Sequence, residues 1–204
     1  MKTVKFLFVL LFILSTPLQL FGRVTESAEN LLRIIHKVNR HWQENNSPQV
    51  RSFWDNAAYH TGNMEVYELT GNTAYLKYST DWAEYNHWKG AASDNKAEWR
   101  YGYGETPQYV LFGDWQCCFQ TYADLYGIRG DDRRIARARE VLEYQMGTDK
   151  NDYWWWADGL YMVMPVMTKL YRITKKSSLS GKVVRILFVC RQCDVRPGSR
   201  VVLP

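Results

Sequence analysis

The residue in this sequence best suited to acid–base chemistry is an aspartate that follows a run of tryptophans. Trp154, Trp155 and Trp156 precede Asp158, and Tyr161 follows it. A carboxyl group buried against aromatic rings has a raised pKa and can donate a proton near neutral pH. The same position suits a helix N-cap, because an aspartate side chain accepts hydrogen bonds from the first helical turn. From the residues alone the N-cap is the simpler interpretation, and the two roles do not exclude each other.

A second aspartate, Asp114, lies between Gly113 and Trp115 at the expected start of another helix, where it could also be an N-cap. The chain is rich in rings, with nine Trp and 15% aromatic residues. We expect many of these rings to lie on a surface that uses them, because core packing alone rarely needs so many.

The elements that must position these side chains are helices. Apolar residues recur with helical period, and no stretch alternates with period two for long enough to indicate a strand. The sequence therefore predicts an all-α chain with six helices, at 25–44, 55–70, 73–88, 115–127, 131–146 and 158–173.

A short motif recurs where these helices turn, with an aliphatic residue before Tyr67, Tyr126 and Tyr171. We expect Gly71 and Gly130 to close helices in the left-handed conformation. Caps for the helices that follow are expected at Asn72 or Thr73 and at Asp131. The third copy lacks the glycine and reads Lys175-Lys176 instead. Repeated helical hairpins at this spacing indicate a solenoid or a closed toroid.

The two ends of the chain differ from its body. Lys2 and Lys5 precede nine apolar residues, Phe6 to Leu14. This run is too short for a membrane span of about 20 residues. It predicts a signal peptide over residues 1–24, export to the periplasm or medium, and no stable membrane anchor. Residues 175–204 are basic and atypical, which suggests a truncated or frame-shifted gene, with a natural C-terminal strap as the alternative.

Charge argues against a nucleic-acid partner. The net charge of +5 arises at the ends: residues 175–204 hold seven Lys or Arg and one acid, and residues 1–24 hold three Lys or Arg and no acid. The remaining 16 basic and 20 acidic residues leave residues 25–174 at −4. A mildly acidic body lacks the basic surface that binds phosphates.

The cysteines are not expected to form a metal site. Cys117 and Cys118 are adjacent and are expected to be small core residues. Cys190 and Cys193 form a lone pair, and a zinc site would need two more ligands at suitable spacing. We therefore expect no metal and no cofactor.

Three segments together resemble a known family. They are Trp54 to Asn63, Tyr101 to Gln116, and above all the Trp-Ala-Asp-Gly-Leu-Tyr-Met segment from Trp156 to Met162. These segments resemble the unsaturated rhamnogalacturonyl hydrolases (glycoside hydrolase family 105) and, more distantly, the unsaturated glucuronyl hydrolases of family 88. The resemblance covers residues 25–174 and implies an (α/α)6 barrel. Such a barrel needs on the order of 300 residues, so this chain would supply about its N-terminal half.

The resemblance also implies an activity and a set of residues. The substrate would be an oligosaccharide with a 4,5-unsaturated uronic acid at its non-reducing end, and the reaction would be hydration of that vinyl ether. Asp158 matches the family's general acid/base, and Asp114 matches its second acidic residue, which orients water or substrate. Flat rings stack on a pyranose, so the candidates for the sugar site are Trp54, Trp155 and Trp156, with His60 on the pocket side. Arg100 is a conceivable partner for the uronate, unless that partner lies in the other half of the barrel.

Two other functions remain open on the sequence. A polysaccharide lyase of helical-toroid type would use a Tyr or His as base and an Arg or Asn to neutralise the uronate. A non-catalytic helical scaffold would bind glycans or proteins through its aromatic residues and would need no carboxyl pair.

Overall fold

The computed structural model describes residues 27–150, 152–154 and 156–175. The chain divides into two units, residues 1–47 and 48–204, each of which is described by itself. In the first unit, residues 27–45 form one helix, close to the predicted 25–44. The expected signal peptide, Cys190, Cys193 and the tail beyond Lys175 lie outside the described residues.

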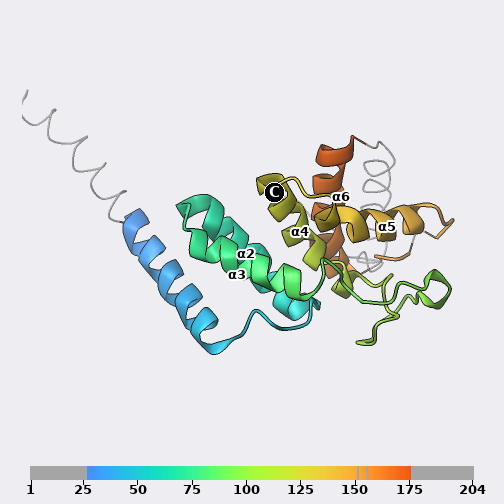
Figure 1. Cartoon of the computed structure of the whole chain (residues 1–204), viewed down its shortest axis with the longest axis horizontal. Helices are drawn as coiled ribbons and strands as arrows, with labels where there is room; N and C mark the ends of the chain where they lie inside the picture. The colour runs from blue at the N-terminus through green and yellow to red at the C-terminus, as the bar shows by residue number, and fades with distance from the viewer. Residues whose placement is uncertain (1–26, 151, 155, 176–204) are drawn as a thin grey trace, which may run out of the picture. The chain divides into compact units, whose positions relative to one another are not determined.

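The second unit consists of helices, and its described part contains no strand, which confirms the all-α prediction (Figure 1). Its α-helices are α2 (Trp54–Thr70), α3 (Thr73–Tyr85), α4 (Cys118–Ile128), α5 (Arg133–Met146) and α6 (Ala157–Thr174). Two 3-10 turns, η1 (Lys96–Glu98) and η2 (Gly113–Trp115), lie between α3 and α4. None of the described helices has the length and apolar character needed to cross a membrane.

The helices pack as hairpins around α4. Helix α4 contacts α2 on one side and α6 on the other, while α3 pairs with α2 and α5 pairs with α4. Most tryptophans serve this packing: Trp82, Trp88, Trp99, Trp115 and Trp154 are all buried. The expectation that many rings lie on a surface is therefore wrong for these five. They are core residues because the hairpins leave large gaps that small side chains would not fill.

The first hairpin turn follows the predicted chemistry, and the third closes in the same way although it lacks the glycine of the motif. Gly71 has φ 67° and its N–H donates to the Tyr67 carbonyl at 2.7 Å, and the Asn72 side chain accepts from the next helix. Lys175 takes the same turn without a glycine, with φ 58° and an N–H bond of 2.8 Å to Tyr171.

The second turn is different. Helix α4 ends at Ile128 and Arg129 is extended, so the left-handed conformation predicted for Gly130 is wrong. The N-cap of α5 is Asp132, without a side-chain cap bond, so the cap predicted at Asp131 is one residue too early. The Asp131 carboxylate still accepts from the Arg133 N–H at 3.1 Å.

A long connector, residues 86–117, joins α3 to α4 and carries much of the pocket described below. Helix α3 ends at Tyr85 instead of the predicted 88, because His87 and Trp88 adopt left-handed φ angles of 53° and 59°. Trp88 is buried and the Arg134 guanidinium lies 4.8 Å from its ring centre. Connections longer than about 12–15 residues are usually functional.

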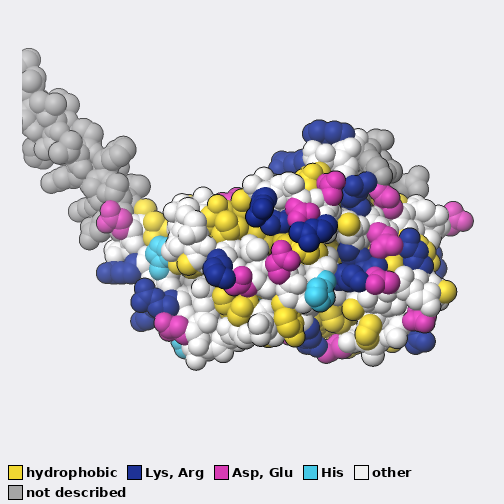
Figure 2. All heavy atoms as spheres, in the orientation of Figure 1, with side chains coloured by type: hydrophobic (Ala, Val, Ile, Leu, Met, Phe, Trp, Pro, Cys, Tyr) yellow, Lys and Arg dark blue, Asp and Glu magenta, His cyan; other side chains and the backbone are white. Residues whose placement is uncertain are grey.

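The surface over α4 and α5 has no area of a single charge. In Figure 2, the dark-blue Lys and Arg side chains there lie among magenta Asp and Glu side chains. This mixture agrees with the near balance of acids and bases in residues 25–174.

Candidate active site

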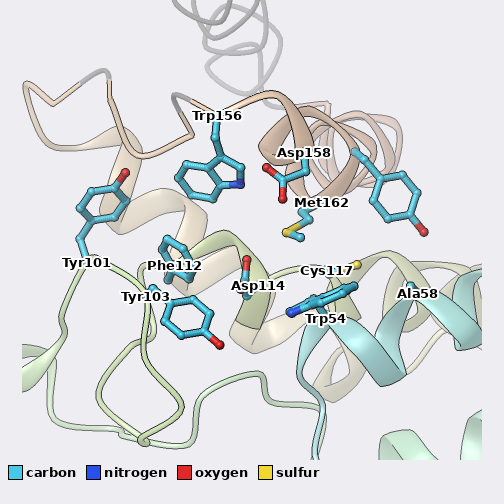
Figure 3. A pocket seen from close by; sticks show the side chains of 12 residues that line it. Trp54, Ala58, Tyr101, Tyr103, Phe112, Asp114, Cys117, Trp156, Asp158 and Met162 are labelled. Atoms are coloured by element: carbon cyan, nitrogen blue, oxygen red, sulfur yellow. The ribbon is translucent and has the colours of Figure 1, made fainter. Parts of the chain in front are cut away.

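A pocket of about 690 Å³ lies where the N-terminal ends of α2, α4 and α6 meet the connector (Figure 3). Three helices that start at one place bring side chains from distant parts of the sequence together. Aromatic and apolar residues form most of the wall, with two carboxyl groups and one thiol among them. The lining residues are Trp54, Ala58, Tyr101, Gly102, Tyr103, Phe112, Asp114, Cys117, Trp156, Asp158, Tyr161 and Met162.

The two predicted acidic residues face each other across this pocket. Asp158 projects from the first turn of α6 toward Asp114, which projects from η2 (Figure 3). Neither side chain caps a helix. The N-cap residues of α4 and α6 are Cys117 and Trp156, and neither helix has a side-chain cap bond at its N-terminus. The N-cap alternative is therefore wrong for both aspartates.

Asp114 is the buried member of the pair. It is 6% exposed. No hydrogen bond from the described residues reaches its carboxyl group. Burial raises its pKa to about 6, and the nearby Asp158 carboxylate adds to the rise. Asp114 can therefore hold a proton close to neutral pH.

The sequence had favoured Asp158 as the buried carboxyl group, and the structure reverses this. Asp158 is exposed and lines the pocket. Of the rings that precede it in sequence, Trp154 enters the core, while Trp156 lines the pocket and stacks on Phe112. Burial falls instead on Asp114, because η2 lies at the base of the connector against the helices.

The thiol of Cys117 also faces this site. Burial raises the pKa of Cys117 to about 12, with a contribution from the charge of Asp114. The thiol therefore stays protonated at neutral pH and adds no charge to the pocket. Its neighbour Cys118 is fully buried, so both residues are small core residues as predicted.

Aromatic rings frame the carboxyl pair on two sides. On one side, Trp156 stacks on Phe112 with ring centres 4.9 Å apart and an angle of 25°, and Tyr103 meets Phe112 edge-on at 6.1 Å. On the other side lies Trp54, which is 43% exposed (Figure 3). Flat rings beside two carboxyl groups suit a bound sugar, whose apolar faces can stack while its reacting atoms meet the acids.

The pocket lacks a cation on its described wall. None of its lining residues is a Lys, Arg or His. Arg100, considered as a partner for a uronate, is exposed and does not line the pocket. A negatively charged substrate group would therefore not find its partner among the described lining residues.

His60 lies in the core, which corrects its assignment to the sugar site. It is 2% exposed and stacks on Trp82 with ring centres 3.9 Å apart, and its Nδ1 lies 3.0 Å from Ser79 Oγ. Burial lowers the pKa of His60 to about 3, so the ring is neutral. It sits on the face of α2 that packs against α3. Trp155, also assigned to the sugar site, lies outside the described residues.

Sequence reasoning missed several lining residues, among them Tyr101, Tyr103 and Phe112 on the connector. Their signal was the Tyr-Gly-Tyr-Gly pattern of residues 101–104. Gly102 has φ 128°, a conformation that other residues rarely adopt, and this turn presents both tyrosines to the pocket. Irregular segments have no period from which such a placement could be read.

Comparisons with known proteins show which family the chain is similar to. The model of Glycosyl Hydrolase Family 88 matches residues 28–193. A solved structure described as a glycosyl hydrolase family 88 protein from Bacteroides vulgatus is 66% identical, with a TM-score of 0.78 over 79% of this chain and 46% of its own. Another, described as a polysaccharide lyase, is 62% identical, with a TM-score of 0.79 over 81% of this chain and 47% of its own. No curated protein matches the chain.

The chain therefore spans less than half of the length of these two solved proteins. Its hairpins form part of an (α/α)6 barrel, the fold of the family 88 structures, as the sequence resemblance implied. The match is to family 88, which the sequence had suggested as the more distant relative. Since the family model covers most of the residues and a solved member is 66% identical, this chain belongs to glycosyl hydrolase family 88.

Proposed function

We propose that this chain is part of an exported glycoside hydrolase that removes a 4,5-unsaturated uronic acid from the non-reducing end of oligosaccharides. One observation carries the proposal. Two carboxyl groups, Asp114 and Asp158, face each other in a ring-lined pocket, and Asp114 is buried without a hydrogen-bond donor among the residues that the structure describes. A buried, unpaired carboxyl group in a pocket is costly for the fold and marks a functional site.

The chemistry that fits this pair is hydration of a vinyl ether. A carboxylic acid donates its proton to C4, and positive charge develops at C5. Water then adds at C5, its proton passes to the carboxylate, and the resulting hemiketal opens with release of the remaining sugar. One carboxyl group can act first as acid and then as base. Because no displacement occurs at the anomeric carbon, the rule that relates carboxylate separation to stereochemistry does not apply.

The two aspartates divide this work. Asp158 is exposed in the pocket, and the family resemblance assigns it the proton transfer to C4. Burial and the nearby Asp158 raise the pKa of Asp114 to about 6, so Asp114 retains its proton to a higher pH than an ordinary carboxyl group does.

The finer parts of the proposal concern substrate and location. The resemblance of the Trp156–Met162 segment to the unsaturated rhamnogalacturonyl hydrolases implies unsaturated uronides of the pectin type as substrates. Export rests on the basic and apolar pattern of residues 1–24. It is tested by fusing these residues to a reporter enzyme and measuring its activity outside the cytoplasm.

The activity is tested with an unsaturated disaccharide, by following the absorbance of its conjugated double bond. Hydration removes this absorbance. Asp158→Asn should reduce turnover by about 10²- to 10⁴-fold, the usual contribution of a general acid/base, and Asp114→Asn should also reduce it. Asp152→Asn is the matched control, since Asp152 is exposed and close in sequence but does not line the pocket. Retention of most activity in Asp158→Asn would remove Asp158 from this role.

A lyase is the second candidate, because one of the similar structures is described as a polysaccharide lyase. A lyase abstracts the C5 proton and creates the double bond. Tyr101, Tyr103 and Tyr161 could supply a base, but the described wall has no cation to neutralise the uronate. On an intact polyuronide, a gain of absorbance would identify lyase action and contradict hydration, whereas binding without any change would indicate a scaffold.

A further inference from the structure

Trp154 lies between the two backbone segments that carry the carboxyl groups. Gly113 immediately precedes Asp114, and Gly159 immediately follows Asp158. A Cβ atom at Gly113 would lie 3.7 Å from Trp154 Cδ1, and one at Gly159 would lie 3.3 Å from Trp154 Cβ. Both segments therefore lie against this tryptophan, and the Gly113 segment also lies against Trp156 and Val163.

Buried amides hold the indole ring in place. Trp154 Nε1 donates to Gln116 Oε1 at 3.0 Å, Gln116 Nε2 donates to Gln145 Oε1 at 2.9 Å, and Gln145 Nε2 donates to the Leu111 carbonyl at 2.9 Å. Trp154 is 1% exposed, and Gln116 and Gln145 are 0% exposed. A fully satisfied buried network of this kind fixes one geometry, because any displacement leaves a polar atom without a partner.

These hydrogen bonds connect Trp154 to the segment that carries Asp114 and to α5. Gln116 lies between η2 and α4, two residues after Asp114, while Gln145 is in the last turn of α5. Among the described residues, Trp154 is the donor that satisfies Gln116 Oε1. Loss of the indole N–H would therefore leave a buried acceptor unpaired next to the segment that carries Asp114.

We propose that Trp154, held by Gln116 and Gln145, is a positioning residue that fixes the separation of Asp114 and Asp158 and thereby the coupling between the two carboxyl groups. The catalytic consequence rests on the proposed hydrolase function, but the coupling itself does not. The sequence had assigned sugar contacts to Trp155 and Trp156 and had given Trp154 no role of its own.

The coupling can be measured because few groups compete with it. The titratable groups that face Asp114 in the pocket are Asp158 and Tyr161 from α6, Cys117 before α4, and Tyr101 and Tyr103 from the connector. Among these groups, Asp158 is the one whose charge raises the pKa of Asp114. Replacing Asp158 therefore reports its influence on Asp114 directly.

The experiment is a double-mutant cycle read by carboxyl-carbon NMR titration of Asp114 in the full chain. In the wild type, Asp158→Asn should lower the pKa of Asp114 by at least about half a unit, because the like charge disappears. In Trp154→Phe, the same Asp158→Asn change should lower it by less than half as much, since the two segments are no longer held together. Trp99→Phe is the matched control: it removes another buried indole donor, to the Ser93 carbonyl at 2.9 Å, and should leave the wild-type coupling intact.

A glycine pair provides a second, gentler test if Trp154→Phe does not fold. Gly159→Ala places a methyl group 3.3 Å from Trp154, whereas Gly62→Ala, inside α2, meets nothing within 4 Å. Gly159→Ala should change the coupling and Gly62→Ala should not. If folded Trp154→Phe, or folded Gly159→Ala, keeps the wild-type coupling, the positioning role is overturned.

Turnover separates this inference from the proposed function. In an active enzyme, Trp154→Phe should lower kcat about tenfold and shift its pH profile, with KM nearly unchanged, because the pair acts on the reacting bond more than on binding. Trp99→Phe should leave both kcat and the profile unchanged for each folded molecule. A wild-type chain with intact coupling but no hydration activity would refute the hydrolase proposal and leave the positioning role standing.

Discussion

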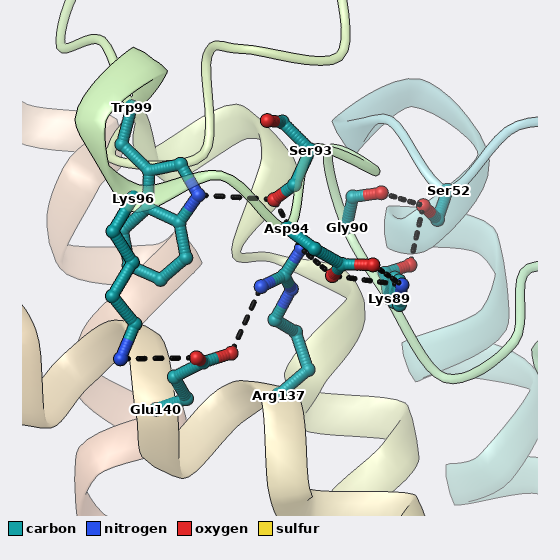
Figure 4. Close-up of polar contacts among 9 residues, drawn as sticks. All are labelled: Ser52, Lys89, Gly90, Ser93, Asp94, Lys96, Trp99, Arg137 and Glu140. Atoms are coloured by element: carbon teal, nitrogen blue, oxygen red, sulfur yellow. Dashed lines mark hydrogen bonds and ion pairs between the residues drawn. The ribbon is translucent and has the colours of Figure 1, made fainter.

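Charged side chains are arranged in opposite ways in the pocket and at the other end of the connector between α3 and α4. In the pocket, two like charges, Asp114 and Asp158, face each other without a cation among the lining residues. At the other end, the connector is fastened to α5 by a group of alternating charges (Figure 4). We call this group the Arg137 cluster, and it consists of Lys89, Asp94, Lys96, Arg137 and Glu140.

Nearly every charge in the Arg137 cluster has a partner. The Arg137 side chain is 5% exposed, and it pairs with Asp94 at 3.0 Å and with Glu140 at 2.9 Å. Its guanidinium also lies 5.2 Å from the centre of the Trp99 ring. The hydrogen bond from Lys89, with the positive charges of Lys89 and Arg137, keeps the pKa of Asp94 below its usual value.

The difference shows what each region is for. Paired charges hold the connector in place, whereas the buried, unpaired carboxyl group of Asp114 weakens the fold. Such a group is retained when its altered pKa serves a reaction. The comparison can be tested by removing one charge at a time from each region and measuring the free energy of unfolding.

The largest effect is expected at the pocket, where removing a charge should stabilise the protein. The pKa of Asp114 is about 6 in the folded chain and 3.8 when unperturbed. As the pH rises from about 4 to about 6, the unfolded chain loses this proton while the folded chain keeps it, so stability falls. This rise in the pKa of Asp114 corresponds to a loss of at most about 3 kcal/mol from the free energy of unfolding. Asp114→Asn should therefore raise the free energy of unfolding at pH 8 by up to about 3 kcal/mol.

Urea unfolding at several pH values checks this effect. The gain from Asp114→Asn should fade below about pH 4, where both states of the wild type are protonated. Asp152→Asn, at an exposed aspartate outside the pocket, serves as control and should show no such dependence. An Asp114→Asn chain that is equally or less stable at pH 8 would mean that the pocket carboxyl group imposes no strain on the fold.

A smaller effect of opposite sign is expected in the Arg137 cluster. Arg137→Met should lower the free energy of unfolding by about 2 kcal/mol, because it removes a buried hydrogen bond to the Ser93 carbonyl and the contact with Trp99. The control is Arg133→Met on the same helix. Arg133 is 75% exposed and pairs with Asp131, so its loss should cost less than about 0.5 kcal/mol. If the two substitutions lowered the free energy of unfolding equally, the Arg137 cluster would stabilise the fold no more than an exposed ion pair does.

The smallest effect is expected at the rim of the same cluster. Lys96 pairs with Glu140 at 3.1 Å and is 53% exposed. Lys96→Met should change the free energy of unfolding by less than about 0.5 kcal/mol. The difference should disappear in about 1 M salt, where charges are screened within about 3 Å. A large effect that survives high salt would show that packing on Trp99, and not charge, holds this side chain.

Local sequence patterns predicted the helices well because their causes are local. The stripe Ile135, Ala138, Val141 and Leu142 repeats at helical spacing, and all four side chains are buried in α5. Asn72 caps a helix as predicted, since a cap needs only the next few residues. The turn at Gly130 was wrong and the one at Lys175 was not foreseen, because the path of the chain between packed helices decides which residue adopts a positive φ.

Patterns in the amino-acid sequence were enough to predict that the chain is helical, which family it resembles, and that Asp114 and Asp158 are the acidic residues to consider. The packing of the helices was needed to show which carboxyl group is buried, that His60 belongs to the core, and that Tyr101 and Tyr103 line the pocket. The two kinds of information differ because the underlying interactions act over different distances along the chain. Helix propensity and capping act over a few residues, whereas desolvation and the repulsion between two carboxylates depend on groups that folding brings together from distant parts of the sequence.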